Sequence, residues 1–479
     1  MNPIKKILIA NRGEIAVRVI RTAKKMGIRT VAVFSDPDRE SLFVKMADES
    51  FALGGTDARS SYLNYEKVIQ ACLETGADAV HPGYGFLSEN TEFASQLESK
   101  GIRFIGPKPE SIKQMGDKIG SRLLVAKFGV PVVPGYEGAS QAMETFRTEA
   151  QKIGYPIMAK ASAGGGGKGM RRINSMEELE SNILSAKREA LSAFGDDRIL
   201  LEKYIINPRH VEFQVFGDKH GNIIHIHERD CSMQRRHQKV VEESPAPRFS
   251  KDLKDKMAEA AILAAKAVAY EGAGTVEFIL GEDGQFFFLE MNTRLQVEHP
   301  VTEKTTGLDL VEWQIRVCQG ETLPDLPEQK GHAIEVRIYA EDPKKNFLPS
   351  IGKIHYLYFP ERDYLRVDSG VVSGSEISVY YDPMIAKLIV WGETRDVAIE
   401  RMKEVLSKTI VFGPKTNLTF LQRLISNESF EQGKVSTHLI ADNESTLFTE
   451  SVPEAYRMAL ASRFFSEKNP TDPWNVEEV

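Results

Sequence analysis

Two hydrophobic periodicities alternate at the start of the chain. The apolar runs Ile7–Ala10 and Thr30–Phe34 have the length of buried strands, and an amphipathic stretch from Glu14 to Met26 separates them. Two further strand candidates follow, Ala79–His81 and Arg103–Gly106. This order predicts a small doubly wound, Rossmann-like parallel domain over residues 1–115.

The pattern changes after this domain. Residues 116–330 are rich in strand-like segments and contain a glycine run, which predicts a second domain with a lid over about 132–204. Residues 331–445 predict an α+β domain, with strands near Ala333–Ala340 and Lys353–Phe359 and a helix at Arg395–Lys408. Residues 446–479 form a polar tail with one candidate helix, Ser451–Phe464. The chain is therefore expected to be multidomain, α/β followed by α+β.

Composition narrows the function classes. Hydrophobic residues make up 42% and charged residues 27%, and no apolar run approaches the ~20 residues that cross a bilayer. The net charge of -7 argues against a nucleic-acid surface. The three cysteines, Cys72, Cys231 and Cys318, are too far apart for metal or redox spacing and suit a reducing compartment. We expect a cytoplasmic protein without membrane or nucleic-acid partners.

A run of glycines at Ala163–Met170 lies between the strand candidates Pro156–Lys160 and Met170–Ile173. These flanks favour a hairpin over a dinucleotide-binding turn, and Gly169 stands where a P-loop requires Ser or Thr. A backbone without Cβ atoms can approach a triphosphate closely, and nearby lysines can add positive charge. The run predicts a lid over a nucleotide; a plain surface hairpin is the alternative.

A second hairpin is predicted over residues 275–292, where two apolar runs flank Asp283-Gly284. A two-residue type I′ turn there pairs Glu282 with Gln285 and places Glu277 opposite Glu290. Strand alternation adds Asn292 to the same face, which gives two carboxylates and an amide oxygen for Mg²⁺. The alternative is a pair of carboxylates that face solvent.

The segment 293–300 continues from this hairpin and alternates polar with apolar residues. If it is extended, Arg294, Gln296 and Glu298 share one face. An arginine fork suits a planar oxyanion such as bicarbonate, and a neighbouring carboxylate can serve as general base. An ordinary ion-paired edge strand is the alternative.

Five motifs in order resemble the biotin carboxylase family over roughly residues 3 to 440. They are the glycine run and the segments Asn11–Ala16, His81–Asn90, Glu228–Lys239 and Glu290–Pro300. The resemblance implies an N-terminal domain, an ATP-grasp domain with a glycine-rich lid and a C-terminal domain. It also implies that MgATP and bicarbonate form carboxyphosphate, which carboxylates biotin on a carrier protein.

The resemblance assigns roles by position. It implies ATP contacts at Lys118, Lys160, Gly166, Gly167, Met170, Glu202, Lys203, Tyr204, Ile205, His210, Gln234, His237, Glu277 and Glu290. It implies that two ions, Mg²⁺ or Mn²⁺, bind to Glu277, Glu290 and Asn292. It implies a bicarbonate site at Lys239, Arg294, Gln296 and Val297, with Glu298 as the base. It implies that biotin contacts Arg337, which stabilises the enolate of biotin, and also Tyr84 and Phe86.

Other interpretations stay open at this point. His210 and His237 also fit buried structural histidines, Cys231 fits a small core residue, and Gly83 and Gly85 explain the Tyr84 loop as a tight turn. An ATP-grasp ligase acting on a small soluble metabolite is a second enzyme hypothesis. A catalytically silent scaffold subunit is a third, from another class.

The partners follow from the resemblance and from what the chain lacks. No Met-Lys-Met biotinylation tripeptide occurs. Biotin is therefore expected in trans, on a carboxyl carrier protein, together with carboxyltransferase subunits, and the resemblance favours a homodimer. Lys168 stands where many bacterial members have arginine. The final acceptor is left open between acetyl-CoA, propionyl-CoA, another acyl-CoA and pyruvate.

Overall fold

The computed structural model describes residues 3–162, 169–236, 238–448 and 462. Its N-terminal part is a parallel sheet of five strands in the order β3-β2-β1-β4-β5. The strands are β1 Lys6–Ile9, β2 Arg29–Phe34, β3 Glu49–Ala52, β4 Ala79–His81 and β5 Arg103–Phe104. The helical segments are α1 Gly13–Lys25, η1 Asp36–Asp38, α2 Leu42–Met46, α3 Tyr65–Thr75 and α4 Thr91–Ser99.

This sheet is doubly wound, as its apolar runs predict. Ile7 and Ile9 enter one hydrophobic cluster with α1, whereas Leu8 enters another with α3 and α4. Successive residues of a strand face opposite sides, so a strand covered on both faces is apolar throughout. The short edge strand β3 escaped prediction because it alternates half-buried and exposed residues.

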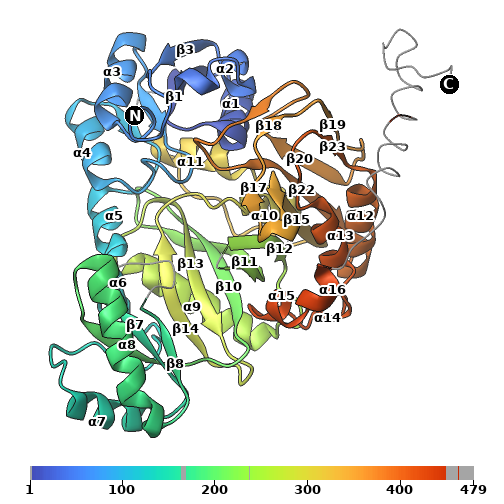
Figure 1. Ribbon diagram of the computed structural model, residues 1–479. Coiled ribbons are helices and arrows are strands. Elements are labelled where there is room, and N and C mark those ends of the chain that lie inside the picture. The colour runs from blue at the N-terminus through green and yellow to red at the C-terminus, as the bar shows by residue number, and fades with distance from the viewer. Residues whose placement is uncertain (1–2, 163–168, 237, 449–461, 463–479) are drawn as a thin grey trace.

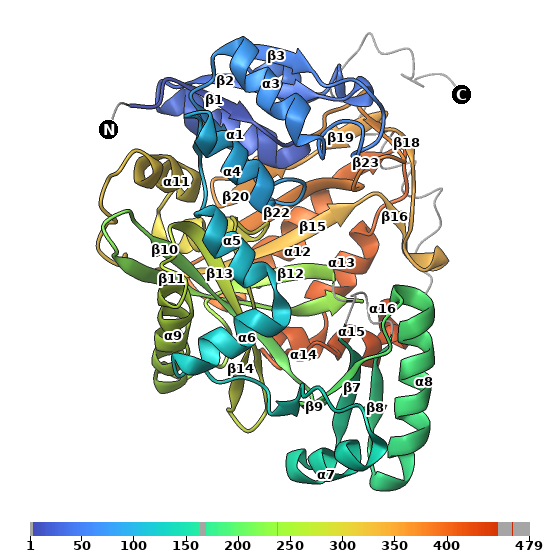
Figure 2. The ribbon, with the colours of Figure 1, turned by 90° about the vertical axis from the view of Figure 1, so that its left-hand side faces the viewer.

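A small lobe projects from the body of the molecule (Figures 1 and 2). It contains a four-stranded sheet, β6-β9-β7-β8, with its own apolar cluster. Its strands are β6 Gly135–Tyr136, β7 Ile157–Ala161, β8 Arg171–Ile173 and β9 Ile199–Lys203, and its helices are α7 Met143–Ile153 and α8 Met176–Phe194. Helices α5 Pro109–Gly116 and α6 Lys118–Lys127 connect the lobe to the N-terminal part. Strands β7 and β8 pair antiparallel, which confirms the flanks of the glycine hairpin.

An eight-stranded sheet forms the centre, in the order β14-β13-β10-β11-β12-β15-β22-β20. Its strands are β10 Arg209–Gly217, β11 Ile223–Arg235, β12 Gln238–Ser244, β13 Gly272–Leu280, β14 Phe286–Asn292, β15 His332–Tyr339, β20 Leu365–Ser369 and β22 Met384–Gly392. Helices α9 Lys251–Lys266, α10 His299–Thr306 and α11 Leu310–Cys318 accompany it. Because β12 pairs with β15, the sheet runs across the boundary predicted at residue 331.

The remaining elements lie at the C-terminal side of this sheet. The strands are β16 Glu341–Asp342, β17 Leu348–Pro349, β18 Gly352–Lys353, β19 Tyr356–Tyr358, β21 Glu376–Ile377 and β23 Ile410–Phe412. The helical segments are η2 Pro343–Lys345, α12 Arg395–Lys408, α13 Leu418–Ile425, α14 Glu428–Glu431, α15 Leu439–Asp442 and α16 Glu444–Leu447. The predicted tail helix falls outside the described residues. Among the helices that the structure describes, none has the length and apolar character to cross a membrane.

Candidate functional site

The hairpin β13–β14 places Glu277 opposite Glu290, as predicted, and Thr275 opposite Asn292. Its turn differs from the prediction. The Gly281 N–H donates to the Gln285 carbonyl at 2.8 Å and the Gly284 N–H donates to the Gly281 carbonyl at 3.1 Å. With Gly284 at a φ of 79°, residues 282–284 form a three-residue loop. The predicted pairing of Glu282 with Gln285 is therefore wrong.

A β-bulge restores the alignment that the turn alone would lose. Phe278 lies opposite Phe288, yet Glu277, one residue earlier, lies opposite Glu290, so Leu289 is the extra residue. Without this bulge the slip at the turn would move Glu290 to the other face of the sheet. The carboxylate pair thus depends on a local irregularity that hydrophobic alternation does not reveal.

Glu277 is buried, and neighbouring hydrogen-bond donors contact both of its oxygens. Its Oε1 accepts from the amides of Asn292 and Gln296, each at 2.7 Å, and Nε2 of His210 lies 2.6 Å from its Oε2. Burial alone would raise the pKa of Glu277, but Lys239 and His210 hold it below its usual range. Glu277 is accordingly a carboxylate at neutral pH.

Glu290 completes the predicted metal-binding pair. Burial raises its pKa, and the negative charge of Glu277 raises it further. Two aligned carboxylates that repel each other in this way form a hard-oxygen set that a divalent cation stabilises. Asn292 is on the same face, although its Oδ1 accepts from Nη2 of Arg294 at 2.9 Å. The residues present fit Mg²⁺ or Mn²⁺.

Lys239 joins three carboxylates at the centre of the site. Its ammonium lies 2.6 Å from Glu212, 3.0 Å from Glu277 and 2.6 Å from Glu298. Burial would lower the pKa of Lys239, but these three anions raise it well above its usual value. Lys239 therefore stays cationic and holds together side chains from three separate segments.

Glu212 was not predicted as a site residue. It pairs with Glu277 across β10 and β13, and its carboxylate also accepts from Nε of the buried Arg229 at 2.6 Å. A usable signal was present in the sequence. His210, Glu212 and Gln214 alternate with the apolar residues Val211, Phe213 and Val215, and polar side chains at every second position of a buried strand are typical of a functional face.

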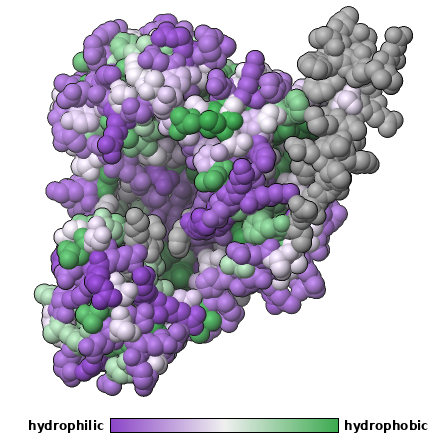
Figure 3. Space-filling model, in the orientation of Figure 1, coloured by the Kyte–Doolittle hydropathy of each residue, from purple (hydrophilic) through white to green (hydrophobic). Residues whose placement is uncertain are grey.

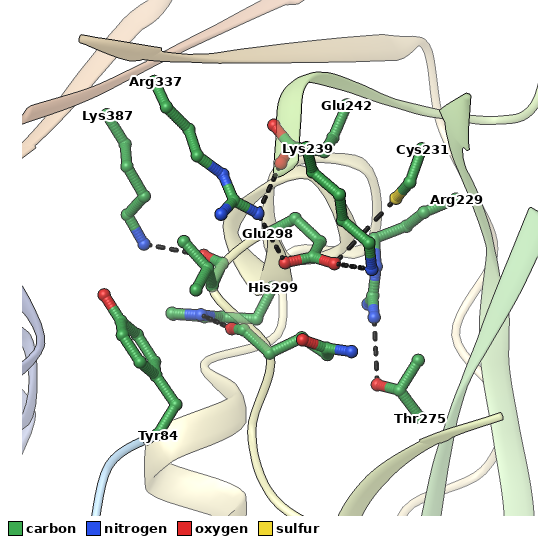
Figure 4. A network of polar contacts seen from close by, with 12 residues as sticks. Tyr84, Arg229, Cys231, Lys239, Glu242, Thr275, Glu298, His299, Arg337 and Lys387 are labelled. Carbon is green, nitrogen blue, oxygen red and sulfur yellow. Dashed lines mark hydrogen bonds and ion pairs between the residues drawn. The ribbon is translucent and has the colours of Figure 1, made fainter. Parts of the chain in front are cut away.

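Glu298 lies at the N-terminus of α10 and is fully buried. It contacts Lys239, Nη2 of Arg337 at 3.0 Å and the thiol of Cys231 at 3.9 Å, as Figure 4 shows. Burial alone would raise its pKa, but Lys239, Arg337 and Arg229 hold it well below the usual value. Arg337 also contacts Glu242 at 2.5 Å. The fold thus joins the base candidate to Arg337 from a distant segment.

Arg294 is held in a loop. The strand conformation on which the prediction for residues 293–300 was conditional does not occur, because β14 ends at Asn292 and residues 293–298 lead into α10 without strand pairing. Two of the three side chains that were expected to share a face are in contact, because Nη1 of Arg294 donates to Gln296 at 3.1 Å. Nε of Arg294 donates to Glu89 at 3.0 Å. Glu89 lies in the motif His81–Asn90, but it was not predicted as a site residue from the sequence.

Some of the predicted nucleotide contacts lie in the small lobe. Lys160 on β7 contacts Glu202 on β9, and Arg122 contacts the same carboxylate from α6. The ammonium of Lys203 donates to the Gly154 carbonyl at 2.8 Å, so this side chain braces the lobe. Arg122 is a cation that sequence reasoning missed, and its position in an amphipathic helix offered no signal.

Other predicted nucleotide contacts lie on the central sheet or in the segments that flank the lobe strands in the sequence. Arg172 stacks over the ring of Tyr204 with 4.4 Å to the centroid, and Met170 and Ile205 are half-buried nearby in the chain. Gln234 contacts Nδ1 of His210 at 2.5 Å. Lys118 begins α6, and its charge offsets part of the rise in the pKa of Glu290. Gly166, Gly167 and His237 are outside the described residues. Figure 3 shows a hydrophilic hollow between the lobe and the rest of the molecule.

The candidate biotin loop lies beside the N-terminal sheet. The Tyr84 hydroxyl donates to Glu14, and Phe86 stacks on Tyr62 with 5.1 Å between ring centroids. Gly83 has a φ of 62°, and a Cβ there would lie 2.9 Å from the Asn11 amide. The tight-loop interpretation therefore holds, alongside any role in binding. Cys231 is fully buried and burial raises its pKa well above the usual value, as suits a core thiol.

Three family models match successive parts of the chain. "Biotin carboxylase, N-terminal domain" covers residues 3–112. "Carbamoyl-phosphate synthase L chain, ATP binding domain" covers residues 117–326. "Biotin carboxylase C-terminal domain" covers residues 335–442. Their order matches the three-part architecture that the motifs implied.

Curated relatives extend over nearly the whole chain. The mitochondrial methylcrotonoyl-CoA carboxylase subunit alpha of Dictyostelium discoideum is 52% identical over 99% of this chain and 70% of its own length. The Glycine max protein of that name is 52% identical over 95% of this chain and 64% of its own. The mitochondrial propionyl-CoA carboxylase alpha chain of Caenorhabditis elegans is 50% identical over 91% and 61%. This chain thus spans about two thirds of these relatives.

Solved structures share the fold. The biotin carboxylase domain dimer of Hydrogenobacter thermophilus 2-oxoglutarate carboxylase, in complex with MgADP, ADP and bicarbonate, superposes with a TM-score of 0.87. It is 46% identical and covers 94% of this chain and 100% of its own. The biotin carboxylase of Campylobacter jejuni, in complex with β,γ-ATP, is 46% identical with a TM-score of 0.86 and coverages of 92% and 99%.

Proposed function

This chain belongs to the biotin carboxylase family, and on that premise we propose that it uses ATP and bicarbonate to carboxylate biotin presented by a carrier protein. The observation that carries the proposal is the buried network of Lys239, Glu298 and Arg337 beside the aligned pair Glu277 and Glu290. It brings together the residues proposed as general base, bicarbonate-binding cation, enolate-stabilising cation and metal ligands.

The nucleotide is proposed to bind between the small lobe and the central sheet. Lys160 and Lys118 supply positive charge for its phosphates, with the glycine run closing as a lid. Glu277, Glu290 and Asn292 would hold two Mg²⁺ or Mn²⁺ ions, which would neutralise charge on the transferring phosphoryl group. The remaining contacts implied by the resemblance are Gly166, Gly167, Met170, Glu202, Lys203, Tyr204, Ile205, His210, Gln234 and His237.

Bicarbonate is proposed to bind between Lys239 and Arg294, with Gln296 and Val297 completing its site. Glu298 takes its proton, an oxygen of the anion attacks the γ-phosphorus, ADP leaves, and carboxyphosphate results. Lys239 holds the pKa of Glu298 low in the structure described here. When the bound anion draws part of that positive charge to itself, Glu298 becomes the stronger base that the step requires.

The second half of the reaction moves carbon. The C–O bond of carboxyphosphate breaks to give CO₂ and phosphate, and the phosphate takes the proton from biotin N1′. The enolate oxygen of biotin then faces Arg337, whose guanidinium stabilises the negative charge, and N1′ attacks CO₂. Tyr84 and Phe86 are proposed to contact biotin from the N-terminal side.

The wider assembly is also a proposal. The alpha subunits that resemble this chain are named as methylcrotonoyl-CoA and propionyl-CoA carboxylases, which supports an acyl-CoA as the final acceptor. A carrier protein, carboxyltransferase subunits and a homodimer complete the proposed assembly, and the solved domain dimer supports the last of these. Those relatives are mitochondrial, so the cytoplasmic location expected from the sequence stays a prediction.

ADP release tests the proposed function. It should require bicarbonate, increase when biotin or a biotinylated carrier is added, and yield acid-labile carboxybiotin. The second candidate, a ligase acting on a small metabolite, predicts ADP release that biotin does not change. That result in protein that binds ATP would contradict the biotin carboxylase proposal.

A further inference from the structure

Lys387, on strand β22, is a fully buried lysine that the proposed reaction does not use. Its ammonium donates to the Val297 carbonyl at 2.7 Å and lies 3.2 Å from Glu14 and 3.9 Å from Asp368. Figure 4 shows it reaching the loop that carries Glu298 from the side opposite Lys239. One side chain thus joins three parts of the molecule: the loop before α10, helix α1 and strand β20.

We propose that Lys387 is a positioning residue for the bicarbonate-activating loop, an inference that rests on the proposed function. Val297 lies between two site residues in the sequence: Gln296, which contacts Glu277, and Glu298, which contacts Lys239. Its carbonyl belongs to the same planar peptide group as the Glu298 N–H. Holding that carbonyl therefore fixes the backbone from which the base projects.

The loop needs such an anchor because regular structure does not supply one. Residues 293–298 have no strand partner among the described residues, and α10 begins only at His299. An apolar side chain of similar size would fill the same space without the free-energy penalty of desolvating a buried ammonium. The presence of a charge here is therefore weak evidence that Lys387 serves to stabilise the fold. A carbonyl ligand inside a catalytic loop indicates a role in geometry.

Lys387 also connects the loop to the candidate biotin contact. Its ion-pair partner Glu14, at the first turn of α1, accepts the Tyr84 hydroxyl. The Val297 carbonyl, Lys387, Glu14 and Tyr84 therefore form one continuous polar chain. The nucleotide contacts Lys160 and Glu202 are on another sheet and are not part of it. Loss of Lys387 should consequently disturb bicarbonate use more than ATP binding.

The test is Lys387→Met, which removes the charge at nearly constant length. The KM for bicarbonate should rise roughly 10-fold or more, or bicarbonate-dependent ADP release should fall by that factor, because small misplacements of reacting groups cost about 10²-fold. The KM for ATP should change less than about 2-fold. The matched control is Arg395→Met, which disrupts the buried contact with Glu243 away from the loop and should leave both KM values near wild type.

A second variant covers loss of folding. If Lys387→Met does not fold, Glu14→Gln keeps the lysine but removes its nearest anion, and should shift the KM for bicarbonate in the same direction by a smaller factor. Folded variants with unchanged bicarbonate kinetics, or with equal rises in both KM values, would overturn the positioning role. Wild-type protein without bicarbonate-dependent ADP release would instead contradict the proposed function itself.

Discussion

The chemical centre and the nucleotide lobe are built in different ways. Glu212, on the eight-stranded sheet, and Glu298, at the N-terminus of α10, are 0% exposed, and each contacts cations from separate segments. Lys160, in the four-stranded lobe, keeps 33% of its side chain exposed and pairs with Glu202. A buried charge network fixes geometry, whereas a small lobe with its own core can move as a body. Substitutions at the centre should therefore affect rate, and those in the lobe affinity.

The largest effect is expected at the centre. Glu298→Gln should reduce bicarbonate-dependent ADP release by about 10² to 10⁴-fold, because the amide cannot accept the proton of bicarbonate. Steady-state ADP release with and without bicarbonate measures this loss. Glu243→Gln is the matched control: it is equally buried on β12 but contacts His332 and Arg395. A comparable loss in the control would indicate a general effect of removing buried carboxylates.

Arg337→Ala should separate the two half-reactions. Carboxybiotin formation should fall by about 10²-fold, because the enolate loses its counter-charge. Bicarbonate-dependent ADP release should fall by a smaller factor. It should not stay unchanged, because Arg337 also contacts Glu298 at 3.0 Å. Quantifying both products in one reaction gives the ratio. Equal losses of the two products would show that Arg337 acts only through Glu298.

Lys160→Met should alter affinity in the lobe. The KM for ATP should rise about 10-fold, equivalent to roughly 1.4 kcal/mol, while kcat changes by less than about 3-fold. Initial rates over a range of ATP concentrations provide both constants. Lys152→Met, which removes an exposed lysine of the same lobe paired with Glu149, should leave them unchanged. A fall in kcat at constant KM would place Lys160 with the chemical centre.

The remaining effect concerns stability and pH rather than catalysis, and two adjacent glutamates should differ in sign. Burial raises the pKa of Glu242 to about 7. Burial would also raise that of Glu243, but hydrogen bonding to His332 and the charge of Arg395 lower it to about 2. A carboxyl group whose pKa is raised in the folded state contributes stability at pH values below its unfolded-state pKa, and this contribution is lost as pH rises through the folded-state pKa. A carboxyl group whose pKa is lowered contributes stability at pH values above its unfolded-state pKa, and this contribution is lost as pH falls.

Urea unfolding of both variants checks this prediction. The free energy of unfolding of wild type, minus that of Glu242→Gln, should fall by about 1 to 3 kcal/mol between pH 5 and pH 7.5. The corresponding difference for Glu243→Gln should stay constant over that range and shrink below pH 4.5. Parallel curves for the two variants would show that the site carboxylate is not perturbed as described.

The sequence predicted those features that local patterns carry. Apolar runs identified four of the five strands of the N-terminal sheet, and the helix predicted from about Arg395 to Lys408 is α12. The assumed turn at Asp283-Gly284 predicted the Glu277–Glu290 pair, although the register at the turn itself differs. The bulge at Leu289 escaped because a compensating slip leaves the same pairing as an unslipped hairpin. Lys387 escaped for another reason: its partners Glu14 and Val297 are far away in the sequence. Contacts of that kind depend on tertiary packing, which no local pattern encodes.

Isotope transfer tests the central claim, attack of bicarbonate oxygen on the γ-phosphate, most directly. With ¹⁸O-labelled bicarbonate in short reactions containing ATP and biotin, the oxygen that forms the new P–O bond stays on phosphorus when the C–O bond of carboxyphosphate breaks. The account predicts one ¹⁸O atom in each phosphate released, and a loss of labelled phosphate in Glu298→Gln that equals its loss of bicarbonate-dependent ADP release. Phosphate without the label, produced at the rate of biotin carboxylation, would contradict it.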